Sequence, residues 1–205
     1  NHLPDICRTL ARLAVRAEVG SDMDLWLARR LDVDRTGIIS NGPNRSPASL
    51  EQVMRDGGTV IADSLRDVRI LQELARSASS RQFPVGLRIN FPLGGNAHPR
   101  LGLQVGSAQF DEAVVGIRRS TGLRLAGLHC HVPSHSVESF AERTRVLIRV
   151  ADQTIPDGPE YLDIGGGFYG GVPSVYPEPG PAPTISDYAE AVCDQLIARY
   201  GTEPS

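Results

Sequence analysis

The chain has 205 residues, of which 40% are hydrophobic and 22% charged, and its formal net charge is −3. This length and composition are typical of one large soluble globular domain. They exclude two classes of partner: no apolar run reaches the roughly 20 residues that cross a bilayer, and the arginines form no basic block for nucleic acid. The three cysteines, Cys7, Cys130 and Cys193, are widely spaced and odd in number, which favours reduced thiols and a cytoplasmic location.

Short runs rich in β-branched residues alternate with longer segments of helical periodicity, about six times along the chain. The predicted strands are residues 15–19, 37–41, 59–63, 85–90, 125–132 and 161–165. The predicted helices are residues 4–13, 21–31, 46–56, 64–78, 107–120, 136–152 and 185–200. Ser21, Ser46 and Ser64 stand at the starts of three of these helices, where a hydroxyl caps the first turn. Because parallel neighbours need a crossover helix, the alternation predicts an α/β fold with a parallel sheet.

Polar side chains stand at the carboxyl ends of the predicted strands. They are Asn41, Asp63, Arg88, Asn90, His129, His131 and Asp163. An open doubly wound sheet would bring together only those near its switch point, whereas a closed barrel gathers all of them at one mouth. We therefore predict a TIM-type (β/α)8 barrel in which two strand–helix units are absent.

The stretch YLDIGGGFYGG, residues 161–171, places three consecutive glycines behind a predicted strand. Gly165, Gly167 and Gly170 fit the pattern G-x-G-x-x-G, but the dinucleotide fingerprint requires a helix next, and here the Pro-rich residues 170–186 follow. Backbone N–H groups without Cβ atoms between them can instead form a nest for a phosphate. A tight turn that needs positive φ is the alternative. The Pro-rich stretch is a candidate rim loop over the mouth, or else a solvent-exposed connection.

The segment GLHCHVPSH, residues 127–135, is a second concentration of chemical groups. Strand alternation would send His129 and His131 to one face and Cys130 to the other, with Ser134 just beyond the strand. Two histidines at this spacing can bind zinc or iron. They can equally form an aromatic platform beneath a flat cofactor, or pack as core histidines.

Four motifs, in order, resemble those of the fold-type III pyridoxal-phosphate decarboxylases that act on basic amino acids and diaminopimelate. GLHCHVPS resembles the family's G-x-x-F-H-x-G-S, and YLDIGGGFYG resembles its L-D-I-G-G-G-F. ISNGPNRSPASL with VIADSLRDVRIL resembles a strand pair that ends in a basic-Ser and then D-S-x-x-E-L, and VGLRINFPLGGNAHPRLGL resembles R-x-N followed by a basic-x-G. The resemblance covers nearly the whole chain and implies the alanine-racemase-like barrel of that family.

The resemblance also implies a pyridoxal 5′-phosphate site at the barrel mouth. Ser134 and the backbone of residues 165–167 would hold the phosphate, His131 would stack on the pyridine ring, and Arg88 would lie near it. Glu18 stands where the family usually has Asp. The implied cofactor-binding residues are Glu18, Arg88, His131, Ser134, Gly165, Gly166 and Gly167, and His131 is also assigned a catalytic role.

Decarboxylation of a basic amino acid or a diaminopimelate-like substrate by a homodimer is the activity that the resemblance implies. Residues 1–205 would then be an incomplete cofactor-binding barrel. The family's cofactor-linked lysine would precede Asn1, the E-P-G-R strand would follow Ser205, and a C-terminal β-sandwich domain would be absent. Two positions depart from the family pattern: Pro133 replaces a glycine, which removes one N–H donor, and Cys130 replaces a usual Phe.

Three alternatives stay open on the residues alone. A racemase or lyase on the same barrel would share the cofactor and break a different bond to Cα. A metal-dependent barrel hydrolase would use His129, His131 and Asp163. A non-catalytic carrier would bind pyridoxal phosphate without turning over any substrate.

Overall fold

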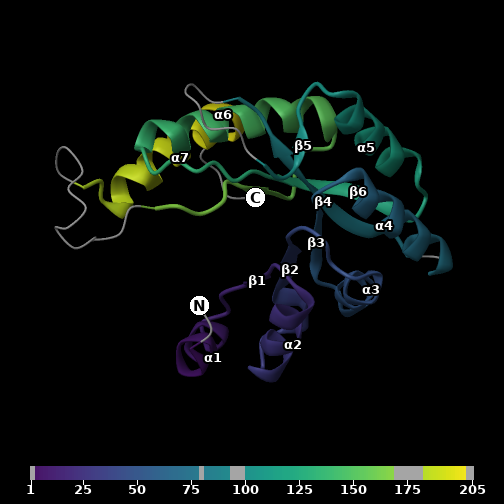
Figure 1. Ribbon diagram of the computed structural model, residues 1–205. Helices are drawn as coiled ribbons and strands as arrows, with labels where there is room; N and C mark the ends of the chain where they lie inside the picture. The colour runs from purple at the N-terminus through teal and green to yellow at the C-terminus, as the bar shows by residue number, and fades with distance from the viewer. Residues whose placement is uncertain (1–2, 79–80, 93–99, 169–181, 202–205) are drawn as a thin grey trace.

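The computed structural model describes residues 3–78, 81–92, 100–168 and 182–201, and Figure 1 shows their course. The strands are β1 (Ala17–Val19), β2 (Ile38–Asn41), β3 (Thr59–Ala62), β4 (Phe83–Asn90), β5 (Leu103–Gln104), β6 (Leu123–His129) and β7 (Tyr161–Asp163). The helices are α1 (Pro4–Arg12), α2 (Asp22–Arg30), α3 (Pro47–Asp56), α4 (Leu65–Ser77), α5 (Ala108–Arg119), α6 (Val137–Thr154) and α7 (Ile185–Tyr200). A short 3₁₀ helix, Arg35–Gly37, precedes β2.

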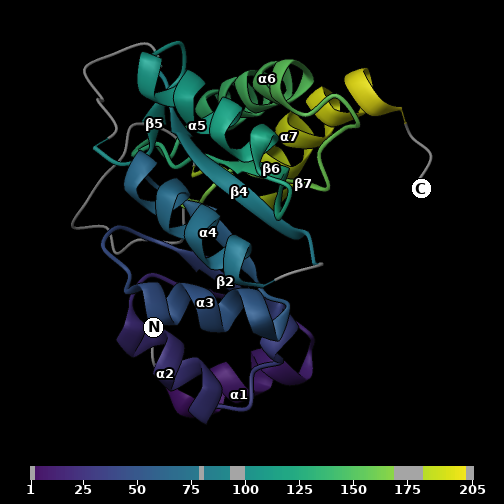
Figure 2. The same cartoon turned by 90° about the vertical axis from the view of Figure 1, so that its right-hand side faces the viewer.

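All strand pairs are parallel, and the strand order is β1-β2-β3-β4-β6-β7, with β5 paired to β4. The main strands follow one another around the sheet in chain order, which is the order of a barrel and not of a doubly wound sheet. The sheet curls, and α2 to α6 lie along its outer side (Figures 1 and 2). The fold is therefore a partial (β/α) barrel, which confirms the predicted fold class.

The hydrophobic core lies between the sheet and the outer helices. On β4, Val85, Leu87 and Ile89 are at most 1% exposed and alternate with the half-buried Arg88 and Asn90. Because neighbouring residues of a strand point to opposite faces, the apolar row packs against the helices and the polar row lies on the inner face.

A buried ion pair joins β2, β3 and the start of α4. Arg45 is 2% exposed and donates from Nη2 to the carbonyl of Ile61 at 2.8 Å and to Oδ2 of Asp67 at 3.0 Å. Its Nη1 donates to the carbonyl and the hydroxyl of Ser40. Asp67 Oδ2 also accepts the backbone N–H of Asp63 at 3.0 Å. These bonds hold the carboxyl ends of β2 and β3 in place.

Helix starts agree with the prediction more closely than strand ends do. Ser21, Ser46 and Ser64 accept backbone N–H bonds at the starts of α2, α3 and α4, as predicted. The strand β5 has two residues, too few for any alternation in the sequence to indicate it. The predicted helix 136–152 and the predicted strand 161–165 differ from α6 and β7 by two residues at their ends.

The strand predicted for residues 125–132 is wrong at its end, because β6 stops at His129. The N–H of Cys130 still donates to the carbonyl of Asp163 at 2.9 Å. Because β7 ends at Asp163, the residues after Cys130 have no strand residue there to pair with. His129 and His131 therefore do not share a strand face: His129 is 2% exposed, whereas His131 is exposed to solvent.

Within the described ranges, no helix combines the length and the apolar character that a bilayer crossing requires. Most of the predicted rim loop falls in residues 169–181, outside the described residues.

Candidate functional site

A row of polar side chains crosses the inner face of the sheet near the carboxyl ends of the strands. Asn41 donates from Nδ2 to Oε1 of Glu18 at 3.1 Å, and Arg88 pairs with Asp63 at 3.3 Å. His129 lies in register with Arg88 on one side and with Asp163 on the other. The row therefore runs from β1 to β7 through Glu18, Asn41, Asp63, Arg88, His129 and Asp163.

Burial and the neighbouring charge of Arg88 favour the neutral form of two imidazoles, those of His129 and His131. Burial, and next the charge of Arg88, lower the pKa of His129 to about 3. Burial and the same guanidinium also lower the pKa of His131. His129 Nε2 lies 4.0 Å from Oδ1 of Asp163. Because a pKa of about 3 leaves the imidazole uncharged at neutral pH, this contact is not an ion pair.

Two carboxyl groups, on the first and last strands of the sheet, influence each other. Burial, and next the charge of Asp163, raise the pKa of Glu18, although the Glu18 residue stays partly exposed to solvent. Burial also raises the pKa of Asp163, against the hydrogen bond from Gly165. The charge of Asp163 on β7 reaches Glu18 on β1, at the other end of the curled sheet. The curvature therefore turns a row along a sheet into a ring of facing groups.

Four buried polar atoms have no hydrogen-bond partner among the described residues. One is Nε of Arg45, in the buried ion pair, and the other three belong to residues of the inner face: Oδ1 of Asn41, Nδ1 of His129 and the hydroxyl of Tyr161. The Tyr161 ring lies against Gly86 and Gly127, where added Cβ atoms would collide with it. An unpaired buried polar group costs about 1–3 kcal/mol, so folded proteins keep few of them. This concentration on one face favours a polar ligand there.

The glycine loop after β7 packs its backbone directly against the segment after β6. Gly165 has φ +70° and Gly167 has φ +100°, conformations that other residues rarely adopt. A Cβ at Gly165 would lie 2.5 Å from the carbonyl oxygen of Cys130 and 3.0 Å from Nδ1 of His131. The absence of a side chain at Gly165 thus allows the imidazole of His131 to lie beside the loop.

The amides of the glycine loop differ in whether they have an acceptor. The N–H of Gly165 donates to Oδ1 of Asp163 at 2.9 Å, so this donor is already used. The N–H groups of Gly166 and Gly167 have no acceptor within the part of the chain that the structure describes. Of the three amides that the sequence assigns to a phosphate, two are thus open to a ligand.

Ser134 and His135 lie next to this loop. Nδ1 of His135 lies 2.7 Å from the carbonyl oxygen of Gly167. The hydroxyl of Ser134 accepts the N–H of Ser136 at 3.4 Å, a long bond that leaves the hydroxyl proton for another acceptor. The structure thus brings His131, Ser134 and residues 165–167 together, with Arg88 on the adjacent strand and Glu18 on the far edge of the sheet.

Arg143 and an aromatic cluster hold these two segments together, and neither was predicted from the sequence. Arg143, on α6, is 0% exposed and donates to Ser134 O at 2.8 Å, Ile164 O at 3.1 Å and Gly166 O at 3.3 Å. A second support is aromatic: Phe140 stacks on Phe168 at 4.7 Å, and Tyr188 on α7 packs edge-on against both and donates to the carbonyl of His135. The sequence does indicate that Arg143 is buried: Phe140, Arg143 and Leu147 follow helical spacing, which places the arginine on the apolar face of the helix.

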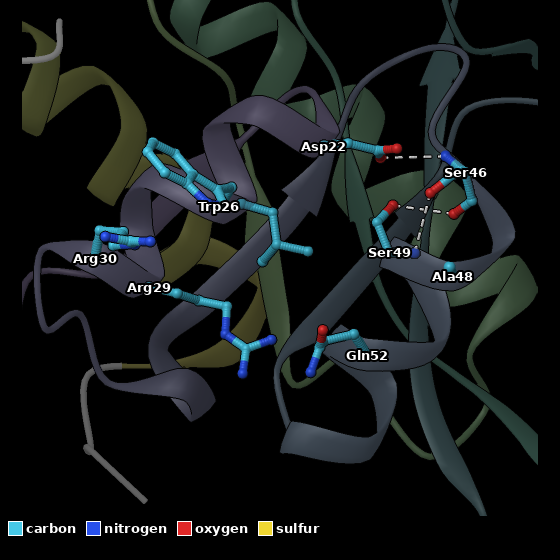
Figure 3. Close-up of a pocket in the computed structure, with 9 residues that line it drawn as sticks. Asp22, Trp26, Arg29, Arg30, Ser46, Ala48, Ser49 and Gln52 are labelled. Atoms are coloured by element: carbon cyan, nitrogen blue, oxygen red, sulfur yellow. Dashed lines mark hydrogen bonds between the residues drawn. The ribbon is translucent and has the colours of Figure 1, made fainter.

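A separate cavity of about 410 Å³ lies between α2 and α3 on the outer, helical side (Figure 3). Trp26, Arg29 and Gln52 face it, and Asp22 at its end accepts the N–H of Ser46 at 3.2 Å. The sheet and its core separate this cavity from the polar inner face, so it is a different surface from the ring of facing groups.

Comparison with known proteins decides the family. Residues 1–203 match the model of the family described as "Pyridoxal-dependent decarboxylase, pyridoxal binding domain". The chain belongs to this family. The match confirms the expected resemblance and, with it, pyridoxal phosphate as the cofactor of the family's domain.

Relatives with curated names are diaminopimelate decarboxylases. The chain is 23% identical over 205 residues to the enzyme of Archaeoglobus fulgidus, a match that covers 95% of the chain and 48% of that protein. It is 29% identical over 180 residues to the probable chloroplastic enzyme of Oryza sativa subsp. japonica, covering 80% of the chain and 36% of that protein. The chain thus spans about half or less of the length of the curated relatives it matches.

Solved structures of the family share the fold. Diaminopimelate decarboxylase from M. jannaschii superimposes with a TM-score of 0.80 at 24% identity, covering 97% of this chain and 48% of the other. The Helicobacter pylori enzyme in complex with L-lysine gives a TM-score of 0.80 at 21% identity, covering 97% and 52%. At these identities the likeness establishes the partial barrel. The metal-hydrolase alternative finds no support: the described residues hold no group of three His, Cys, Asp or Glu side chains that could bind a metal ion.

Proposed function

We propose that the protein containing this chain decarboxylates an amino acid with the help of pyridoxal 5′-phosphate, and that diaminopimelate or a basic amino acid is the substrate. One observation carries the proposal: in a chain of the pyridoxal-binding family, His131 lies beside a glycine loop whose amides at Gly166 and Gly167 have no acceptor among the described residues. The names of the curated relatives support diaminopimelate as the first substrate to test.

The residues at the ends of β6 and β7 fit a flat ring that carries a phosphate. The open amides at Gly166 and Gly167 and the hydroxyl of Ser134 would hold the phosphate, because phosphate oxygens accept hydrogen bonds from clustered N–H and O–H donors. The imidazole of His131 would lie against the ring. Its lowered pKa keeps it uncharged, as stacking on an electron-poor heterocycle requires.

When bound, pyridoxal phosphate supplies a conjugated ring that accepts the electron pair left when carbon dioxide departs. The chain's own residues bind, orient and set the charge around that ring. Arg88, held in place by Asp63 at 3.3 Å, supplies the positive charge beside the imidazoles. Glu18 and Asp163, whose pKa values are raised, are the groups able to hold a proton on the inner face closer to neutral pH.

Product analysis tests this function directly. The protein is incubated with pyridoxal phosphate and, separately, with meso-diaminopimelate, lysine, ornithine and arginine, while carbon dioxide and amine products are measured. We expect release of one carbon dioxide per diaminopimelate and formation of lysine. Inversion at Cα without carbon dioxide would contradict decarboxylation and identify a racemase. A cofactor spectrum with no product from any amino acid would identify a carrier.

Two features of the whole protein belong to the same proposal. Residues 1–205 would act as one cofactor-binding unit of a partial barrel, and the protein would be a homodimer. Analytical ultracentrifugation of the protein with bound cofactor tests the second feature, and a single monomeric species at micromolar concentration would contradict it.

A further inference from the structure

A buried arginine lies behind the glycine loop, on the helix side of the site. The guanidinium of Arg143 forms no ion pair with a carboxylate in the described part of the chain. It bonds instead to backbone carbonyl groups of both loops and to Ser139, and the Phe140 ring covers it at 3.9 Å. A buried cation is costly unless dipoles replace the lost water. The carbonyl groups around it are therefore held in one orientation.

Each carbonyl that Arg143 binds also fixes the direction of the N–H group in the same peptide unit. The described residues contain no cis peptide bond, and in a trans peptide the N–H points opposite to the C=O. The effect is visible at Gly165: the carbonyl of Ile164 points to Arg143, and the Gly165 N–H points the other way, to Asp163. By the same rule, the bond from Arg143 to the carbonyl of Gly166 turns the open N–H of Gly167 away from α6.

We propose that Arg143 is a positioning residue that makes this site select a phosphate ester over the same compound without phosphate. It would act in two ways: its bond to the carbonyl of Gly166 orients the open N–H of Gly167, and it leaves a positive charge behind the loop that no carboxylate of the described residues neutralises. The guanidinium itself would not touch the phosphate, because it is 0% exposed and its donors are bound to the two loops. The inference rests on the proposed function, since the phosphate ester is pyridoxal 5′-phosphate.

The test compares two ligands that differ only in the phosphate. The dissociation constants of pyridoxal 5′-phosphate and of pyridoxal are measured by absorbance titration for the protein containing this chain and for Arg143→Met and Arg143→Lys. Two controls lie on the same helix: Arg149→Met removes an exposed arginine, and Leu147→Ala truncates a buried core side chain one turn after Arg143.

We expect Arg143→Met to reduce the preference for the phosphorylated compound by about tenfold or more, because the N–H of Gly167 is no longer held in its orientation and the positive charge behind the loop is gone. Arg143→Lys keeps the charge but cannot bridge both loops, so its preference should fall by about threefold or more. This variant decides the matter if Arg143→Met does not fold. Both controls should keep the wild-type preference.

Two outcomes would contradict the role of Arg143, and a third would contradict the phosphate site. A preference in both Arg143 variants within about twofold of wild type would overturn the role of Arg143 alone. A loss in Leu147→Ala as large as in Arg143→Met would overturn it as well, because general loosening would then explain the effect. Wild-type protein that binds both compounds equally would overturn the phosphate site itself, and the proposed function with it.

Discussion

Two buried arginines hold the two halves of the sheet, and they differ in what neutralises them. Arg45 ties β2 and β3 to α4 and meets the carboxylate of Asp67 at 3.0 Å, with both side chains at most 2% exposed. Arg143 ties the loops after β6 and β7 to α6 and meets carbonyl groups, without a carboxylate among the described residues. Both bridge segments far apart in the sequence. Of the two, only Arg143 has a positive charge that no carboxylate of the described residues neutralises.

This difference distinguishes an arginine that stabilises the sheet from one that acts on the candidate site. A cation paired with a buried carboxylate has its charge largely balanced at close range, so its main effect is to fix the strand ends. A cation held by carbonyl dipoles keeps its charge, and the amides on the far side of those dipoles face the place where an anion would sit. The half of the sheet with the unneutralised arginine is also the half with the glycine loop and His131.

The largest expected effect breaks the neutral pair. Arg45→Met should lower the free energy of unfolding by about 3–5 kcal/mol, because the buried Asp67 carboxylate loses its cation at 3.0 Å and keeps only the exposed Arg66 at 3.7 Å. In an Asp67→Asn background the same change should cost clearly less. Arg55→Gln, which removes an exposed ion pair with Glu51, should cost less than about 0.5 kcal/mol. Urea unfolding of wild type, Arg45→Met, Asp67→Asn, the double variant and Arg55→Gln measures this, and equal costs of Arg45→Met in both backgrounds would contradict the account of Arg45.

A second prediction concerns acid stability in the charged half. The folded-state pKa of His129 is about 3, below the ordinary value of 6.5, so the unfolded chain takes up a proton first as the pH falls. Wild-type stability relative to His129→Gln should therefore decline between pH 6.5 and 3, by at most about 1.4 kcal/mol per pH unit. The raised pKa values of Glu18 and Asp163 act with the opposite sign but are common to both proteins. A difference that stays constant with pH would show that His129 is not buried as a neutral group.

A third prediction separates close packing from backbone strain in the loop. Gly158 and Gly165 both have positive φ, +83° and +70°, but a Cβ at Gly158 would meet nothing within 4 Å, whereas one at Gly165 would meet the Cys130 carbonyl. Gly158→Ala should cost about 1–2 kcal/mol from strain alone. Gly165→Ala should cost roughly 1–3 kcal/mol more, because it pushes the two loops apart. Thermal unfolding compares them, and equal losses would mean that the loops tolerate separation.

The smallest effect is a shift in the titration of His131. The charge of Arg143 is one cause that lowers the pKa of His131, after burial and Arg88, whereas Arg45 is not among the causes. Arg143→Met should therefore raise the pKa of His131, and Arg45→Met should leave it in place, as NMR titration of the imidazole can show. A folded-state pKa below the unfolded value costs stability as the pH falls, so the Arg143 variant should lose less stability through His131 in acid than wild type. A pKa of His131 unchanged in Arg143→Met would contradict the uncompensated charge.

Local patterns in the sequence were sufficient for the helices, for most of the strands and for their parallel order. Strand alternation and serine caps depend on neighbours within a few positions, and the motifs around His131 and Gly165 lie in short continuous stretches. Tertiary structure decided what depends on distant neighbours. It ended β6 at His129, gave the N–H of Gly165 to Asp163, and buried Arg143 among the carbonyl groups of two loops. Burial and charge add up over residues far apart in the chain, so no short stretch of sequence contains them.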